Sequence, residues 1–169
     1  MIEITKEIKQ KIYDLYNECI ENLEPFHRKL DLFIVPDTLA QRIMKETTID
    51  VAGHWVCIDN YGITHALEHH GKPVSEGKRG QAAVEKEDFI KMLDVLLQSD
   101  EIQFIGKTKK TQRLLLQFIR QIDDKIYVVK EVRTITSQRK NKISRLVFHT
   151  MYKKIKPTFG MTALKTYEA

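Results

Sequence analysis

Three of the six histidines stand close together in residues 63–81, a stretch whose residue types suit phosphate chemistry. His65, His69 and His70 precede a glycine-rich segment in which Lys78 and Arg79 lie between two glycines. Reactions at a phosphate ester commonly need one group that removes a proton and another that supplies one. Histidine suits both roles because its pKa lies near neutrality, and the planar arginine side chain binds two phosphate oxygens. The stretch therefore indicates a proton-transfer group beside a bound phosphate.

The spacing of these histidines leaves two pairings open. If residues 63–70 are helical, His65 and His69 share a face, whereas His70 points about 140° away from His65. For His65 the alternative is a packing histidine. A His-x3-His pair can also bind zinc, but no third ligand is suggested and the glutamate of an HExxH motif is missing. No metal or other cofactor is therefore expected.

A strand at 125–134 supplies the next candidate side chains. Alternation places Glu131 and Arg133 on one face with Tyr127, and Val128 and Val132 on the other. The valine face is the expected core face, so Glu131 and Arg133 would present an acid and a guanidinium together at a cleft. The alternative is a cross-strand ion pair on a solvated face.

The last expected strand, 143–153, adds possible phosphate ligands. Thr150 could donate to a phosphate oxygen and Lys153 could neutralise it, while His149 is assigned to packing or a secondary role. Both faces of this strand look half-buried, so a bend or bulge is expected.

Composition and charge narrow the class of protein. The 169 residues carry 42% hydrophobic and 30% charged side chains, and no apolar run approaches the roughly 20 residues that span a bilayer. The N-terminus lacks an apolar signal core, and Cys19 and Cys57 lack metal-ligand spacing. We expect a cytoplasmic protein with reduced thiols and no membrane contact.

The net charge of +5 conceals an asymmetry. Residues 1–100 contain 12 Lys/Arg against 18 Asp/Glu, and residues 101–169 contain 16 against 5. A basic half of this kind indicates a polyanionic partner, most commonly nucleic acid, although a solvated lysine-rich surface is the alternative.

Hydrophobic periodicity gives the elements that must position these residues. The patterns predict helices at 5–23 and 38–45, a strand at 51–58, a helix at 63–70, a loop at 72–81 and a helix at 86–98. Four strands whose hydrophobic period is two follow, at 102–105, 113–122, 125–136 and 143–153. This order argues for an α+β fold, with N-terminal helices followed by an antiparallel sheet of about four to five strands. We expect a helical extension at 1–50, a main domain at 51–156 and a tail at 157–169.

Four segments in this order carry a family resemblance: ITHALEHHG (63–71), EGKRGQAAVEKEDF (76–89), KIYVVKEVRT (125–134) and HTMYK (149–153). Together they resemble the phage-associated branch of the barnase/EndoU/colicin/RelE-like (BECR) ribonucleases. The resemblance implies a compact BECR-like nuclease domain of helices followed by an antiparallel sheet. It also implies metal-independent endoribonuclease activity, often as a toxin or phage-encoded effector.

The resemblance also implies roles for single residues. The family's two motif histidines fall on His65 and His70, and the other motif positions give a catalytic set completed by Glu131, Arg133 and Thr150. Lys78, Arg79 and Lys153 would bind phosphate. His69 is an additional histidine, and Lys130 stands where an acid is common.

The implied partners are an RNA substrate and, for a toxic nuclease, an immunity or antitoxin protein. Two other functions stay open. One is a non-catalytic nucleic-acid-binding module, which would bind RNA in a salt-dependent way without turnover. The other is a phage structural or interaction protein that uses its N-terminal helices.

Overall fold

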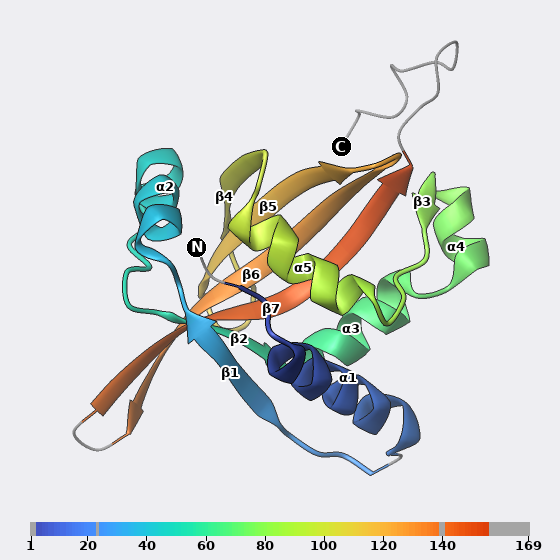
Figure 1. The fold of residues 1–169 in the computed structure, drawn as a ribbon, viewed down its shortest axis with the longest axis horizontal. Coiled ribbons are helices and arrows are strands. Elements are labelled where there is room, and N and C mark those ends of the chain that lie inside the picture. The colour runs from blue at the N-terminus through green and yellow to red at the C-terminus, as the bar shows by residue number, and fades with distance from the viewer. Residues whose placement is uncertain (1–2, 23, 139–140, 156–169) are drawn as a thin grey trace.

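The computed structural model describes residues 3–22, 24–138 and 141–155 of the chain (Figure 1). The helices are α1 (Lys6–Glu21), α2 (Asp37–Thr47), α3 (Asn60–His70), α4 (Pro73–Lys78) and α5 (Asp88–Leu97). The strands are β1 (Lys29–Ile34), β2 (Trp55–Asp59), β3 (Gln81–Ala82), β4 (Glu101–Lys107), β5 (Leu114–Ile122), β6 (Lys125–Gln138) and β7 (Asn141–Ile155). The predicted tail, 157–169, lies outside the described residues. No helix in the described part of the chain is both long and apolar enough to cross a bilayer.

All described strands join one sheet in the order β1-β2-β7-β6-β5-β4, with β3 paired to the far end of β7. The predicted α+β class is confirmed, but the sheet is larger than expected and mixed. β2 runs parallel to β7, with Trp55 opposite Arg145, whereas the other pairs are antiparallel. The parallel pair joins segments about ninety residues apart in the chain, a distance over which local alternation carries no pairing information.

The N-terminal region contains a strand, although a helical extension was expected at 1–50. α1 begins where predicted, and the Thr5 side chain accepts a hydrogen bond from the Ile8 backbone N–H at 3.2 Å. Residues 29–34, within the expected helical extension, instead form the edge strand β1. A bidentate contact between Asp31 and Arg145 of β7, at 2.7 and 3.0 Å, spans β2 at this edge.

A single hydrophobic core lies between the helices and one face of the sheet. α5 crosses that face and α1 packs beside it (Figure 1). The Phe89 ring of α5 meets Phe148 of β7 edge-on at 5.8 Å between ring centroids, and Tyr16 of α1 lies 5.8 Å from Phe89. The sheet contributes side chains from its central strands: Leu116, Phe118, Tyr127, Val129, Leu146, Phe148 and Met151. We call this side the core face.

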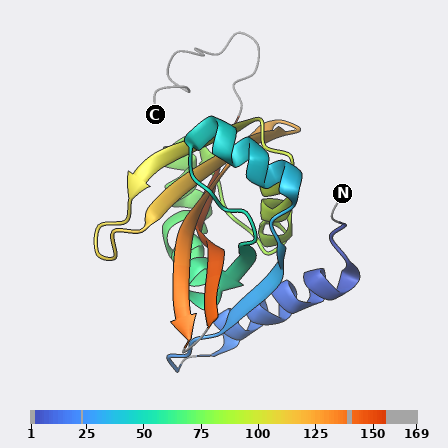
Figure 2. The same ribbon diagram turned by 90° about the vertical axis from the view of Figure 1, so that its left-hand side faces the viewer.

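The opposite side of the sheet carries the second set of side chains, and we call it the groove face. Val128, Val132 and Val147 are buried there but do not belong to the core cluster. In Figure 2 the yellow loop between β4 and β5 projects from the side of the strands opposite to the dark-blue helix α1. This loop, residues 108–113, is rich in basic residues and overhangs one end of the groove face.

Candidate active site

The position of α3 is set by the point where β2 ends. β2 pairs with β7 only as far as Val147, and beyond it α3 continues alongside β7 in place of a strand. The Asp59 side chain caps the helix by accepting a hydrogen bond from the Gly62 backbone N–H at 2.9 Å. A Cβ atom on Gly62 would lie 2.6 Å from the Phe148 carbonyl oxygen, so only glycine lets the helix approach this closely.

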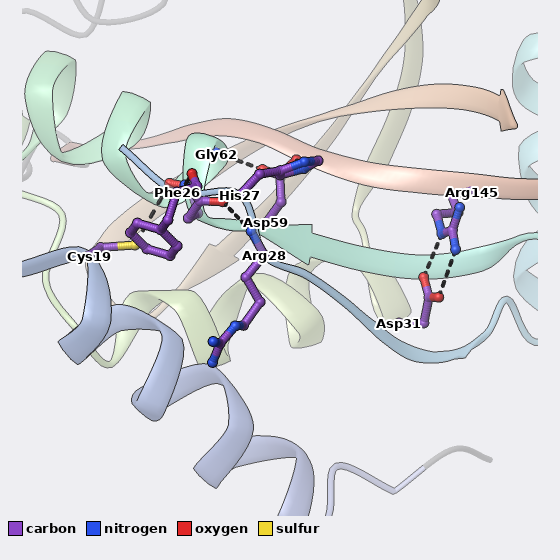
Figure 3. Close-up of polar contacts among 9 residues, drawn as sticks. Cys19, Phe26, His27, Arg28, Asp31, Asp59, Gly62 and Arg145 are labelled. Carbon is purple, nitrogen blue, oxygen red and sulfur yellow. Dashed lines mark hydrogen bonds and ion pairs between the residues drawn. The ribbon is translucent and has the colours of Figure 1, made fainter. Parts of the chain in front are cut away.

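A buried asparagine fixes the start of α3 against the chain that precedes β1. The Asn60 side chain donates to the Phe26 carbonyl oxygen at 2.6 Å and accepts from the Arg28 backbone N–H at 2.8 Å. Figure 3 shows Phe26, His27 and Arg28 beside the capping residue Asp59. Because the side chain uses both its donor and its acceptor, the segment 26–28 and the first turn of α3 are held together.

Strand β7 contains the bulge that its sequence predicted, and the extra residue is His149. Lys130 pairs with Thr150, but the next residue of β6, Glu131, pairs with Phe148, which leaves His149 without an opposite residue. The bulge directs His149 toward α3, where its ring lies 5.4 Å from the His65 ring between centroids. His69 stacks on His65 at 4.4 Å. We refer to His65, His69 and His149 as the histidine cluster.

The surroundings of His65 and His149 favour their neutral imidazole forms. Burial lowers the pKa of His65 below its usual 6.5, and the charges of His69 and His149 lower it further. Burial also lowers the pKa of His149, with a further contribution from the Lys130 ammonium. At neutral pH both rings are therefore available as proton acceptors.

His65 and His149 line a groove of about 620 Å³ on the groove face. Its walls come from the first turns of α3, the β4–β5 loop and strands β5, β6 and β7: Asp59, Tyr61, Gly62, His65, Lys107–Thr111, Arg113, Leu115, Val132, Thr134, Val147, Phe148 and His149. The floor is mainly apolar, and one wall carries Lys107 at the end of β4 together with Lys109, Lys110 and Arg113 of the loop. A concave apolar surface with a few converging cationic and titratable groups is typical of a ligand site.

His70 points away from the histidine cluster, as helical geometry predicted. Its Nδ1 lies 3.3 Å from an oxygen of Glu76, and its ring lies 5.3 Å from that of Tyr152. Burial lowers the pKa of His70, and the hydrogen bond that the Glu76 carboxylate accepts from its ring opposes that effect. The fully buried Glu76 carboxylate also pairs with Arg79, which in turn donates to the His69 carbonyl oxygen at 2.8 Å. The structure therefore places His70 next to the cluster but not in the groove wall.

The expected loop 72–81 is partly helical, and this changes the surroundings of its basic residues. Residues 73–78 form α4, with Pro73 at the first helical position. Lys78 is exposed at the end of α4, and neither it nor Arg79 lines the groove. Arg79 joins α3 to α4 through Glu76, while its side chain stays partly exposed.

The prediction that the face of β6 carrying Val128 and Val132 is the core face is wrong. Tyr127 and Val129 belong to the core cluster, so Glu131, two residues further along the same face, is buried with no exposed surface. The error arose because both faces of this central strand carry large apolar side chains, which leaves alternation without a preferred direction. Neither Glu131 nor Arg133 lines the groove.

Glu131 lies beneath the bulge in an apolar environment. Burial raises its pKa well above 4.5, the Asp59 carboxylate raises it further, and the nearby His149 backbone N–H favours the ionised form. Neither carboxylate oxygen forms a hydrogen bond within the described residues. Burial therefore favours the neutral carboxylic acid form of this side chain.

The two predicted phosphate ligands of β7 are also buried. Thr150 lies on the groove face opposite Lys130, and its hydroxyl has no partner among the described residues. Lys153 lies on the core face, where its ammonium contacts the Asp88 carboxylate at 2.7 Å. Tyr127 donates to the other oxygen of Asp88 at 3.1 Å. The charge of the Lys153 ammonium is thus balanced by the buried Asp88 carboxylate.

The groove contains residues that the sequence interpretation left out. His149 was assigned to packing or a secondary role, and the basic segment between the strands expected at 102–105 and 113–122 was given no part in the site. Two signals were available: the expected bulge in β7 and the concentration of positive charge in KTKKTQR (107–113). In the described residues no group of three or more His, Cys, Asp or Glu side chains is arranged to hold a metal ion.

These features define a class of protein. A sheet with helices on its core face and a basic groove lined by paired imidazoles on the other is suited to bind and cut a phosphodiester backbone, and this marks a nuclease domain. The chain belongs to the phage-Barnase-EndoU-ColicinE5/D-RelE like nuclease3 family, whose model matches residues 34–158. The resemblance to BECR nucleases is therefore confirmed. Comparison with curated proteins and with solved structures gave no significant match.

Proposed function

We propose that the protein is a metal-independent endoribonuclease that cleaves RNA by transphosphorylation from the ribose 2′-hydroxyl. The observation that carries this proposal is the pair formed by His65 and His149, with rings 5.4 Å apart at the wall of a basic groove. Two imidazoles that face the same space can act as base and acid on one phosphodiester without help from a metal.

In the proposed reaction one neutral imidazole takes the proton from the 2′-hydroxyl, and the 2′-oxygen attacks the adjacent phosphorus. The second imidazole, in its protonated form, gives its proton to the departing 5′-oxygen. The products are a 2′,3′-cyclic phosphate and a new 5′-hydroxyl end. Negative charge grows on the phosphate oxygens as the bond breaks. Lys107 at the end of β4 and the loop cations Lys109, Lys110 and Arg113 lie along the same groove to stabilise it.

His70 is the alternative partner for His65, because the family motif includes it and because the Glu76 carboxylate orients its ring. A carboxylate on Nδ1 fixes the tautomer and leaves Nε2 to exchange protons. We favour His149, since it lines the groove together with His65 and His70 does not. Arg79, which donates to the His69 carbonyl oxygen, would position the cluster rather than contact the phosphate.

The test is incubation of the purified protein with RNA in EDTA, followed by analysis of the product ends. We expect 2′,3′-cyclic phosphate ends and, for His65→Ala and His149→Ala, a loss of about 100-fold or more in rate. Thermal unfolding of each variant checks that the fold survives. Lys45→Ala, an exposed substitution on α2, is the matched surface control.

Three outcomes separate the alternatives. Loss of activity in His70→Ala with full activity in His149→Ala would transfer the second proton role to His70. Salt-dependent RNA binding with no cleavage in several RNA classes would support the non-catalytic module instead. Growth arrest on expression of the wild type, absent for His65→Ala, would support a toxin that needs an immunity partner.

A further inference from the structure

We propose that the groove binds single-stranded RNA and that Tyr61 is the platform on which one unpaired base stacks. This inference rests on the proposed ribonuclease function and specifies the form of its substrate. It starts from the exposure of Tyr61, which leaves 59% of its surface open although the residue lies at the start of a well-packed helix.

Tyr61 is placed to hold the nucleotide next to the bond that is cut. It lines the groove and lies four residues before His65 on α3, so the two side chains project from the same helical face. Side chains at this spacing are about 5–6 Å apart at their Cβ atoms. A base stacked on the Tyr61 ring would thus bring its ribose and phosphate to the histidine pair.

The ring is held in place by contacts that have no role in the hydrophobic core. The His27 ring stacks on Tyr61 at 5.0 Å, with 33° between the ring planes, and His27 Nε2 lies 4.0 Å from an Asp59 oxygen. The two hydrogen bonds of the buried Asn60 fix the segment that carries His27. An aromatic side chain that is both exposed and rigidly supported binds a base with little loss of rotamer freedom.

The rest of the groove matches a single strand better than a duplex. Leu115, Val132 and Val147 form an apolar floor that would contact a base or ribose, and the basic loop faces the backbone phosphates. An A-form duplex keeps its bases paired and offers mainly phosphates and 2′-hydroxyls to a protein, so it would leave this floor and Tyr61 unused. Stacking on aromatic rings beside a basic track is the usual mode for unpaired nucleic acid.

The test measures binding without cleavage. A 2′-O-methyl RNA oligonucleotide lacks the attacking hydroxyl, and one 2-aminopurine base reports stacking through fluorescence quenching. We expect quenching on binding to the wild type. Tyr61→Ala should weaken the single-strand affinity about tenfold to a hundredfold and remove the quenching, while Tyr61→Phe keeps both. Phe104→Ala, which removes a 45%-exposed ring outside the groove, should bind as the wild type does.

A matched 2′-O-methyl duplex should bind more weakly and should be insensitive to Tyr61→Ala. Wild-type affinity in Tyr61→Ala, or duplex binding equal to single-strand binding, would overturn the proposal. The cleavage assay tests the ribonuclease function separately from the stacking role of Tyr61. RNA that is cut normally by Tyr61→Ala with unchanged affinity refutes the stacking role alone, whereas Tyr61-dependent quenching without any cleavage refutes the ribonuclease function alone.

Discussion

Replacement of the buried Glu131 by glutamine should stabilise the protein, and increasingly so as the pH rises. Glu131 has no exposed surface and no hydrogen-bond partner among the described residues. Burial, followed by the Asp59 carboxylate, raises its pKa well above 4.5. Glutamine has nearly the same shape and stays neutral at every pH, so Glu131→Gln removes the titration and leaves the packing close to unchanged.

The direction in which stability changes with pH follows from proton linkage. Between the unfolded pKa and the higher folded pKa, the folded state keeps the proton of Glu131 while the unfolded state has lost it, so rising pH favours unfolding. The stability that this carboxyl contributes is complete below pH 4.5 and declines toward the folded pKa. Within that window the wild type should lose about 1.4 kcal/mol per pH unit relative to Glu131→Gln.

Urea unfolding of both proteins across the range from about pH 4.5 to 8 measures this difference. Histidines whose pKa is lowered by burial also titrate in this range, but they are present in both proteins and cancel in the difference. Glu46→Gln, an exposed substitution on α2, is the control and should give a flat difference. The assignment of a buried neutral carboxyl would be refuted if the difference in the free energy of unfolding between Glu131→Gln and the wild type did not change with pH. It would also be refuted if the wild type gained stability relative to Glu131→Gln as the pH rises.

Three further predictions concern the parts around the site. Gly62→Ala should lower the free energy of unfolding by about 1–3 kcal/mol and reduce cleavage, because its Cβ would meet the β7 backbone at 2.6 Å. The control is Gly77→Ala, whose Cβ would meet nothing within 4 Å, and equal urea midpoints for the two variants would contradict the argument. Asp88→Leu should cost about 3–5 kcal/mol by leaving the Lys153 ammonium buried and unpaired, and adding Lys153→Met should recover most of that loss in the same urea assay. The rate of RNA cleavage should peak below pH 6.5, since the pKa values of both proposed catalytic histidines are lowered, and an optimum well above 6.5 in a pH–rate profile would argue against that pair.

The fold class was predictable where the periodicity was strong and local. α1 and α5 each show one clear helical period, and the segments of β4 to β7 are strand-like in composition, so these elements form close to their expected positions. The parallel pairing of β2 with β7 was not predictable, because it depends on where two distant segments meet. α4 was missed because its six residues, which include a glycine and a proline, resemble a loop in composition.

The candidate site was predictable in its residue types but only partly in its geometry. The helical angle correctly separated His70 from the His65–His69 face, and the expected bulge in β7 is present. Which face of β6 would be buried could not be read from alternation, since both faces are apolar, and the assignment of Glu131 to a cleft failed for that reason. His149 enters the groove wall only because the bulge turns it out of the strand's regular alternation.

The unfavourable features of this fold gather where β2 ends and α3 begins. At this corner of the sheet the structure contains a glycine-dependent close approach, a bulge that breaks strand pairing and a buried carboxyl that has no hydrogen-bond partner among the described residues. Each of these lowers stability, and a continuous strand with apolar neighbours would avoid all three. Their common effect is to bring His65 and His149 together at the groove wall. The proposed proton transfer requires this arrangement of the two rings, whereas packing alone does not.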